Sequence, residues 1–399
     1  MFEAVRAARR LVGLGLVVAG CALGGCGGVA APGSPGGSSR PEVHRGVAQA
    51  HTLPGDQLLA GPVLVDHRAV WVEGGHRLLV RSLDAHGRTR TLFSTSATPG
   101  APKGILWPFY VPSIAAGDGR VAFEELVTPC ASAPPRALRC PRTMGDRPVY
   151  SVTVFAGRPG AIRPVESLLT PPPAKSCQGR PEPYAVAVAD AGLVDYEVSF
   201  FPCDRAVSRL VLRSYSGRLV RVLARGLPVT TPFVTAGDWA ALIRSSALGS
   251  KPDQLQIVRI STGQTVLRLR RRCLLRIDAV ALDGSGRFAV ITYTPRSSSC
   301  QQQNGFLRVG QIGHSRLRIL AKKGPEALPT TSIAIASGIV AYGRPTGRSL
   351  TGTQVVITAP GAAPTPIPGM KFGSPLAFDG RMVATAHNHT VQVAAIPRR

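Results

Sequence analysis

The chain has 399 residues, of which 44% are hydrophobic, so it can bury a full core without structural metals. Its formal net charge is +25, yet only six of its 47 basic residues are lysines. Such an arginine excess often reflects a GC-rich genome. The charge alone therefore does not predict nucleic acid or another polyanion as a partner.

The N-terminal 20 residues have the features of an export signal. Three of the first ten residues are arginine, and the apolar run Leu11–Gly20 that follows is short for a membrane span. The run ends in Val-Ala-Gly-Cys, which resembles the bacterial lipoprotein signal. This resemblance implies cleavage before Cys21 and lipidation of that cysteine, with Cys26 as the second choice.

A flexible tether is expected to follow the signal peptide. Glycine, proline and serine dominate residues 27–45. We therefore expect a signal peptide over 1–20, a lipid-anchored tether over 21–45, and a location at the extracytoplasmic face of a bacterial cell membrane. The alternative is an uncleaved anchor, since residues 11–32 carry no charge, although seven glycines weaken that stretch as a helix.

One short sequence motif recurs through the rest of the chain. It consists of a turn residue, a variable residue, and then small and apolar residues typical of a strand. Clear copies begin at Gly119, Gly192, Gly286, Gly338 and Gly380, and looser copies begin at His67 and Asp238. Each interval has room for four strands, and no long stretch after residue 50 shows a helical period. The pattern predicts an all-β chain of seven four-stranded blades, a β-propeller over 46–397.

The two ends of this domain are expected to share a blade. The last unit offers only three strands, and the run Gly46–Thr52 would supply the fourth and remove an exposed edge. The segment Leu282–Ala289 resembles the turn between the first two strands of a blade in TolB-like and WD-type propellers. The Trp-Asp signature of true WD repeats is missing, so the resemblance implies architecture alone. Six or eight blades, or a pair of β-sandwiches, are the alternatives.

Six cysteines lie beyond the signal, and an even number in an exported protein predicts disulfides. In two blades, one cysteine precedes the first strand and another follows the second strand, so both lie at the same end of the blade. The predicted bridges are Cys177–Cys203, Cys273–Cys300 and, by remainder, Cys130–Cys140. The alternative, a metal cluster, lacks Cys-x-x-Cys spacing.

The connections that leave the second and fourth strands of each blade are long and should project from one face. Binding residues often lie on loops that a rigid scaffold holds. Trp107, Phe109 and Tyr110 lie in one of these loops and are candidate binding residues. The alternatives are that the loops are tolerated insertions and that the aromatic side chains cap the core.

Two sets of side chains could carry chemistry. Carboxylates follow the aromatic position of the second strand in three successive blades, and Glu125 and Glu197 are the weak catalytic candidates; ion pairing with arginine is the alternative. His387 and His389 are weak metal candidates, because no third ligand lies nearby in sequence. We find no P-loop, nucleophile elbow or zinc-protease motif, and we expect no cofactor.

Arginines alternate along two predicted outer strands. Arg268, Arg270, Arg272, Arg316 and Arg318 are candidates for binding an anionic polymer or lipid headgroups. The alternative is that charged outer strands discourage edge-to-edge aggregation.

Together these features predict a surface-anchored, noncatalytic propeller scaffold. Its partner would be an envelope protein, bound by the long-loop face, or an anionic envelope polymer. We do not expect nucleic acid as a partner. One alternative is a propeller hydrolase or lyase acting on envelope glycans. A second is an extracytoplasmic sensor domain.

Overall fold

Contacts divide the chain into two units, Met1–Arg45 and Gly46–Arg399, and every described residue belongs to the second. The computed structural model describes residues 46–54, 56–74, 77–95, 109–110, 113–127, 151–169, 181–200, 206–228, 231–244, 253–269, 276–295, 302–314, 316–322, 332–345, 353–387 and 389–396. Within these ranges, no helix is long and apolar enough to cross a membrane.

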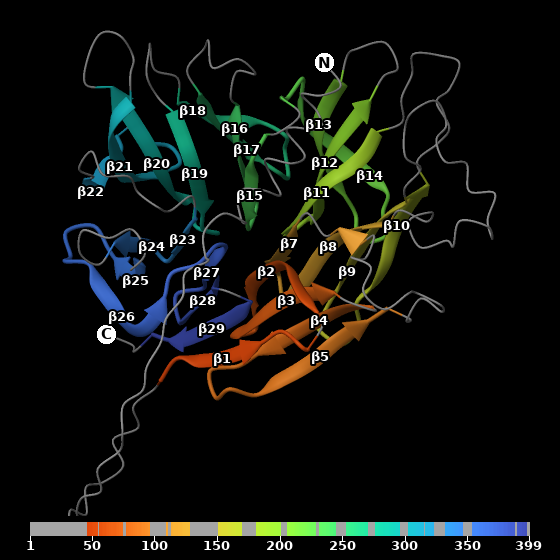
Figure 1. The fold of residues 1–399 in the computed structure, drawn as a ribbon. Helices are drawn as coiled ribbons and strands as arrows, with labels where there is room; N and C mark the ends of the chain where they lie inside the picture. Colours follow the sequence, from red (N-terminus) through yellow and green to blue (C-terminus); the bar gives the residue numbers. More distant parts are fainter. Residues whose placement is uncertain are drawn as a thin grey trace, which may run out of the picture. The chain divides into compact units, whose positions relative to one another are not determined.

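The described residues form seven antiparallel sheets, each a blade (Figure 1). Blade 1 contains β2 (Gln57–Val65), β3 (Arg68–Gly74), β4 (Leu78–Leu83) and β5 (Thr89–Ser94). Blade 2 contains β6 (Phe109–Tyr110), β7 (Ile114–Gly117), β8 (Arg120–Val127), β9 (Ser151–Gly157) and β10 (Arg163–Leu169). Here β6 and β7 both pair with β8, so two short strands share the innermost position.

Blades 3 and 4 repeat the four-strand order. Blade 3 contains β11 (Pro181–Ala189), β12 (Gly192–Phe200), β13 (Ala206–Arg213) and β14 (Leu219–Arg225). Blade 4 contains β15 (Phe233–Ala236), β16 (Trp239–Arg244), β17 (Gln254–Arg259) and β18 (Thr265–Leu269).

Blades 5 and 6 follow in the same order. Blade 5 contains β19 (Arg276–Leu282), β20 (Arg287–Pro295), β21 (Gln302–Gln311) and β22 (Arg318–Lys322). Blade 6 contains β23 (Ile333–Ala336), β24 (Ile339–Pro345), β25 (Thr353–Thr358) and β26 (Thr365–Lys371).

Blade 7 joins the two ends of the domain, as the sequence predicts. Its strands are β27 (Leu376–Phe378), β28 (Met382–His387), β29 (Thr390–Ala395) and β1 (Ala48–His51). Strand β1 pairs antiparallel with β29, from Ala48 opposite Val393 to His51 opposite Thr390. The red first strand therefore lies beside the blue last strand in Figure 1. The prediction of seven four-stranded blades is confirmed.

Apolar side chains fill the interfaces between neighbouring blades. Successive residues of a strand point to opposite faces of its sheet, so each second strand contributes alternate residues to two interfaces. On β8, Phe123 packs toward blade 1 and Ala122 toward blade 3. One buried apolar cluster lies at each of the seven interfaces. Among the described residues, the cluster between blades 2 and 3 has the fewest buried members, and buried charged side chains lie in the same interface.

Candidate functional site

A cavity of about 520 Å³ runs along the axis of the ring. All seven innermost strands contribute to its wall, from Val63 on β2 to Phe378 on β27. The wall contains many residues with little or no side chain, among them Ala116, Gly117, Ala236, Gly237, Ala334 and Ala336. Small side chains at the centre of the ring leave the axis hollow.

The cavity reaches the turns that join the first and second strands of the blades. Antiparallel strand order places these turns at one end of the ring and the long connections predicted from the sequence at the other. Four aspartates border the cavity at the turn end: Asp118, Asp190, Asp283 and Asp379. We call this end of the cavity the axial mouth.

The four carboxylates differ in how far their hydrogen-bonding capacity is used. Asp283 accepts from the backbone N–H groups of Ser285 and Arg287, both at 3.0 Å. Asp379 accepts from two backbone N–H groups and contacts His67 Nδ1 at 2.9 Å. These two side chains therefore hold their own turns and, for Asp379, the junction of blades 7 and 1.

Asp118 and Asp190 are exposed and less constrained. Asp118 lies 3.7 Å from Arg120 Nε, a weak ion pair at the surface. The Asp190 carboxylate makes no hydrogen bond or ion pair with any described residue. The axial mouth thus offers negative charge and acceptor oxygens to a molecule that enters it.

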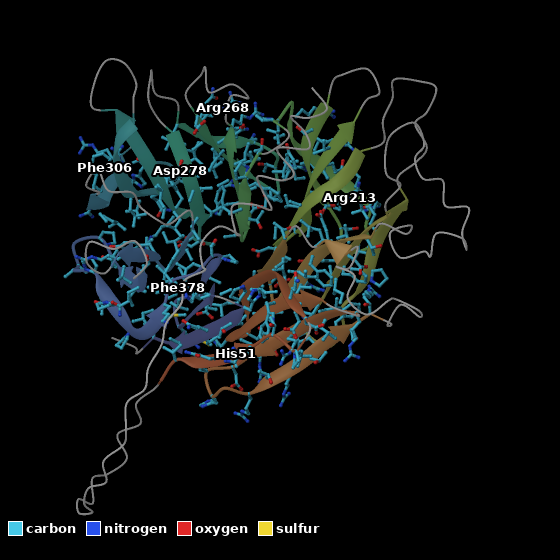
Figure 2. The ribbon with its side chains drawn as sticks, in the orientation of Figure 1. His51, Arg213, Arg268, Asp278, Phe306 and Phe378 are labelled. Carbon is cyan, nitrogen blue, oxygen red and sulfur yellow. The ribbon has the colours of Figure 1, made fainter. Side chains whose placement is uncertain are left out.

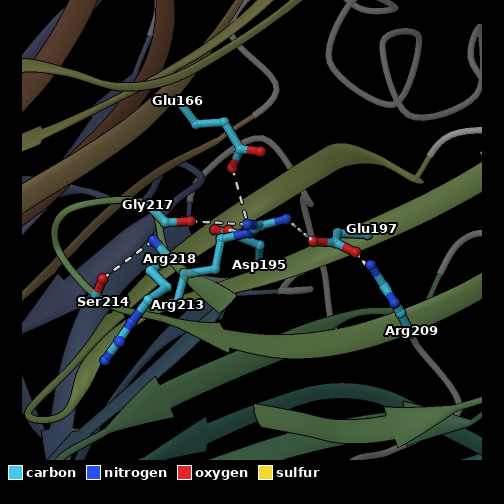
Figure 3. A network of polar contacts seen from close by, with 8 residues as sticks. All are labelled: Glu166, Asp195, Glu197, Arg209, Arg213, Ser214, Gly217 and Arg218. Carbon is cyan, nitrogen blue, oxygen red and sulfur yellow. Dashed lines mark hydrogen bonds and ion pairs between the residues drawn. The ribbon is translucent and has the colours of Figure 1, made fainter. Parts of the chain in front are cut away.

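A second polar cluster lies buried between blades 2 and 3 (Figure 3). Asp195 and Glu197 are two residues apart on β12, so both point to the face that meets blade 2. Register places Arg209 of β13 directly opposite Glu197. Arg213 lies further along the same strand, where it reaches Asp195 and Glu197 diagonally.

Arg213 is the centre of this cluster. One of its terminal nitrogens lies 2.5 Å from Glu197, and the other donates to the carbonyl of Gly217 at 2.9 Å. Its Nε lies 3.0 Å from Asp195 and 3.3 Å from Glu166 of β10, contacts that are ion pairs without hydrogen-bond alignment. Arg209 Nε donates to the second oxygen of Glu197 at 2.5 Å. One arginine therefore ties two blades together.

Carboxyl groups outnumber guanidinium groups in this interface. Glu124 of β8 is fully buried on the same side, and neither of its oxygens has a hydrogen-bond partner. Burial, reinforced by the charge of Asp195, raises its pKa well above the usual value. Burial also raises the pKa of Asp195 to about 7. The interface therefore retains protons at a pH where ordinary carboxyl groups are charged.

A smaller cluster of polar side chains lies at the junction of blades 7 and 1. The fully buried Glu73 accepts from Arg81 at 2.9 Å and from the Trp71 indole N–H at 3.3 Å. Arg81 also donates to the carbonyl of His51, the last residue of β1, at 3.2 Å. The strand that closes the ring is thus attached to blade 1 by a side chain as well as to blade 7 by its backbone.

The catalytic candidates lie away from the cavity. Glu125 and Glu197 are 6% and 1% exposed between blades, and neither lines the axial wall. Burial raises the pKa of Glu125 to about 7, a value that suits general acid–base chemistry. A substrate in the axial cavity would nevertheless not touch either group. Glu73 and Glu197 have arginine partners, as the ion-pair interpretation expects, whereas Glu124 and Glu125 form no ion pair with a described residue.

The two metal candidates lie at the last hairpin, His387 at the end of β28 and His389 in the turn that follows. His387 Nδ1 lies 3.2 Å from the Phe372 carbonyl, and His389 lies in the last hairpin with φ of 62°. Within the described parts of the chain, no three His, Cys, Asp or Glu side chains come together in a way that could hold a metal ion.

Several residues predicted as sites lie outside the part of the chain that the structure describes. The lipidation candidates Cys21 and Cys26, the aromatic Trp107 and the basic Arg270 and Arg272 are among them. So are all cysteines of the three predicted disulfides, Cys130–Cys140, Cys177–Cys203 and Cys273–Cys300. Phe109 and Tyr110 form β6, but their side chains are not described. Arg268, Arg316 and Arg318 are exposed, and Figure 2 labels the first of them.

Sequence reasoning missed Asp195, Glu166, Arg209 and Arg213 as members of one cluster. A signal was present, because two carboxylates two residues apart on one strand and two arginines on the next match an antiparallel hairpin. It also missed the aspartates of the axial mouth as a group. Their signal was the repeated Asp at the first turn of several blades.

Comparison with known proteins supports the fold alone. No family model matches the sequence, and no curated protein matches it. A chain from the complex of KlAtg21 with the coiled-coil of AgAtg16 is 12% identical, with a TM-score of 0.51, over 86% of this chain and 95% of that one. The β-propeller domain of the Trilobed protease from Pyrococcus furiosus is 10% identical, with a TM-score of 0.46, over 83% and 92%.

Larger proteins also resemble the chain in part. Pyrococcus horikoshii acylaminoacyl peptidase is 7% identical, with a TM-score of 0.49, over 82% of this chain. The match covers 49% of that peptidase, so the chain spans about half its length. The structural neighbours are thus β-propeller domains from proteins with different activities.

Proposed function

We propose that this protein is a noncatalytic binding scaffold, anchored at the extracytoplasmic face of the membrane, whose partner binds one end of the ring. The axial cavity carries the proposal, because all seven blades wall it and its mouth presents partly unpaired carboxylates. Concave sites on rigid scaffolds are where ligands most often bind. Cationic groups or hydrogen-bond donors are the chemistry that suits Asp118 and Asp190.

The opposite, long-loop end is the second place where a partner could bind. The candidates there are Trp107, Phe109 and Tyr110, and their support is the sequence: an aromatic run in a loop held by a rigid ring. Both ends fit a scaffold or a sensor domain, since each would hold a protein or an envelope component without chemistry. The two ends therefore call for a direct comparison.

The test is photo-crosslinking in living cells with a photoreactive amino acid at one position at a time. Ser285 samples the axial mouth and Trp107 the predicted long-loop end, and Thr89, exposed on the outer strand of blade 1, is the matched control. We expect a discrete adduct from Ser285 or Trp107 and none from Thr89. Adducts from neither end, in a protein that folds and reaches the membrane, would contradict the scaffold proposal.

Substitution of the two catalytic candidates tests the hydrolase alternative through the cellular phenotype. Glu125→Gln and Glu197→Gln remove the acid–base groups and keep a similar side-chain volume. A scaffold should keep its cellular role in either variant at normal protein levels. If either variant reproduces the phenotype of losing the whole protein, the enzyme hypothesis replaces the scaffold.

A further inference from the structure

The outermost strands of the seven blades carry charge of almost one sign. These strands are β5, β10, β14, β18, β22, β26 and β1, and they contain eight arginines or lysines but one carboxylate, Glu166. Glu166 contacts Arg213 in the interface between blades 2 and 3, so it does not neutralise the outside. The outer surface of the ring is therefore a basic rim.

Acidic residues gather at the opposite radius. Aspartates occur in the first turn of six blades, next to the axis: Asp66, Asp118, Asp190, Asp238, Asp283 and Asp379. Arginines follow four of these turns, at Arg68, Arg120, Arg287 and Arg381, so the charge near the axis is mixed. The outer strands, with eight basic residues and one carboxylate, are the more basic part of the ring.

Protection of the sheet edges does not require charge of one sign. Edge strands are protected by charge of either sign, by proline or by short length. Strand β26 uses proline, at Pro366 and Pro368, and β1 is only four residues long. Six of the seven outer strands nevertheless carry a basic residue, which gives the rim a positive charge that an anion can contact.

Cations on several outer strands, among them Arg90, Arg163 and Lys371, are exposed and form no ion pair with a described residue, and blades 3, 4 and 5 add one more arginine beside theirs. Arg225, Arg268 and Arg318 are exposed on three successive outer strands, and none forms an ion pair with any described residue.

Arg244 of β16 is this additional cation, because one of its terminal nitrogens donates to the carbonyl of Arg225 at 3.1 Å while its Nε is buried without a hydrogen-bond partner. Burial and the neighbouring charge of Arg268 lower the pKa of Arg244. Like charges held together without a counter-ion favour an anion between them.

We propose that the rim of blades 3–5 binds a linear polyanion through its phosphate or carboxylate groups. Arg225, Arg268 and Arg318 would each contact a separate anionic group of the chain. The outer strands of blades 3 and 5 point about 100° apart, two steps of a seven-membered ring. A flexible polymer can follow that curvature, whereas a flat membrane cannot contact all three strands at once. The proposal is independent of any partner at the ends of the ring.

The experiment measures the affinity of the full chain, purified in neutral detergent, for fluorescent inorganic polyphosphate and poly-L-glutamate. The test variant is Arg225→Glu, Arg268→Glu and Arg318→Glu together. The control combines Arg77→Glu, Arg259→Glu and Arg381→Glu, three exposed arginines off the outer strands, with the same change in net charge. Circular dichroism and thermal unfolding verify folding, and an Arg→Gln triple variant replaces the test variant if it does not fold.

We expect the test variant to lose about a hundredfold in affinity, because each basic residue near an anionic surface contributes about fivefold. The control should stay within about threefold of the parent protein, and affinity should fall with added salt. Equal losses in test and control would overturn the proposal, since net charge alone would then govern binding. Soluble dihexanoylphosphatidylglycerol is the final competitor. If it displaces the polymer at equal phosphate concentration, the rim recognises single headgroups and the polymer proposal is wrong.

Discussion

At the scale of single residues, buried charge is tolerated here only where a partner is built in. Glu73 has no exposed surface, and Arg81 supplies its positive charge while also holding the carbonyl of His51. Removing one member of such a pair leaves the other charge buried without a partner. This lowers the free energy of unfolding by more than the intact pair contributes to it. The same logic applies to Glu197 between Arg209 and Arg213.

The first prediction follows from that asymmetry. Arg81→Ala should lower the free energy of unfolding by about 3 kcal/mol or more. The substitution leaves the Glu73 carboxylate buried without a positive partner and removes the hydrogen bond to His51 of β1. The double variant Glu73→Gln with Arg81→Met should recover most of the loss, since no buried charge remains. Chemical denaturation of the three proteins measures both effects. Equal stability of the single variant and the parent protein would show that the pair does not hold the junction.

The second prediction concerns pH. Glu124 and Asp195 hold protons in the folded protein at pH values where the unfolded chain has released them, because burial raises their pKa values. Between about pH 4 and pH 7 the folded state binds more protons, so the free energy of unfolding falls as pH rises, by roughly 1 kcal/mol per unit for each group. Thermal unfolding should show a more stable protein at pH 5.5 than at pH 8.

A variant separates Glu124 from its neighbours. Glu124 shares its interface with Asp195, Glu197, Glu166, Arg209 and Arg213, so several groups contribute to the profile. Glu124→Gln keeps a neutral side chain at every pH and should flatten the stability profile above pH 6. Asp66→Asn changes an exposed turn residue and should leave the profile unchanged. A parent-like slope in Glu124→Gln would mean that Glu124 does not retain its proton.

At the scale of elements, the turn before each second strand sets the geometry of a blade. Gly192 begins β12 with φ of 144°, and a Cβ there would lie 2.1 Å from the carbonyl oxygen of Arg213. No side chain fits that space without breaking the β12–β13 ladder. Gly87, in the hairpin between β4 and β5, also has a positive φ of 81° but has open space around it.

These two glycines form a matched pair for the third prediction. Gly87→Ala should cost about 1 kcal/mol, the strain of the backbone conformation alone. Gly192→Ala should cost at least about 2 kcal/mol, because steric overlap with Arg213 adds to the strain. Denaturation midpoints measure the difference. Similar costs at both positions would mean that the strand pair shifts to admit the methyl group.

The fourth prediction concerns the closing strand. Deleting residues 46–52 removes β1 and exposes the edge of β29, an unpaired strand that can join another molecule. We expect a lower melting temperature and self-association on size-exclusion chromatography. Deleting seven residues from the predicted tether, 30–36, is the matched control. A monomer of unchanged stability after the first deletion would show that three strands suffice for blade 7.

At the scale of the whole molecule, the seven interfaces are not equal. Counted over the described residues, six interfaces contain eight or more buried apolar side chains, and the interface of blades 2 and 3 contains six, with charged groups beside them. Apolar contact is stable over a wide pH range, whereas proton loss from buried carboxyl groups is costly. The ring should therefore open first between blades 2 and 3 as pH rises.

Hydrogen exchange tests this fifth prediction. Relative to the intrinsic rate at each pH, amides of β8 and β12 should lose protection between pH 6 and pH 8.5, while those of β16 and β20 at the blade 4–5 interface should not. Uniform protection loss around the ring would contradict a weak interface at this position.

Local patterns in the sequence predict seven blades, the start of each second strand and the closure by residues 46–52. These predictions rest on turn residues and two-residue periodicity, which can be recognised without knowing which strands become neighbours. That Asp118 and Asp190 border one cavity, and that Glu166 meets Arg213, is visible only in the folded ring. Their proximity depends on how whole sheets face one another across the ring. Short-range patterns describe how a strand alternates, but not which side chain of the next blade it will meet.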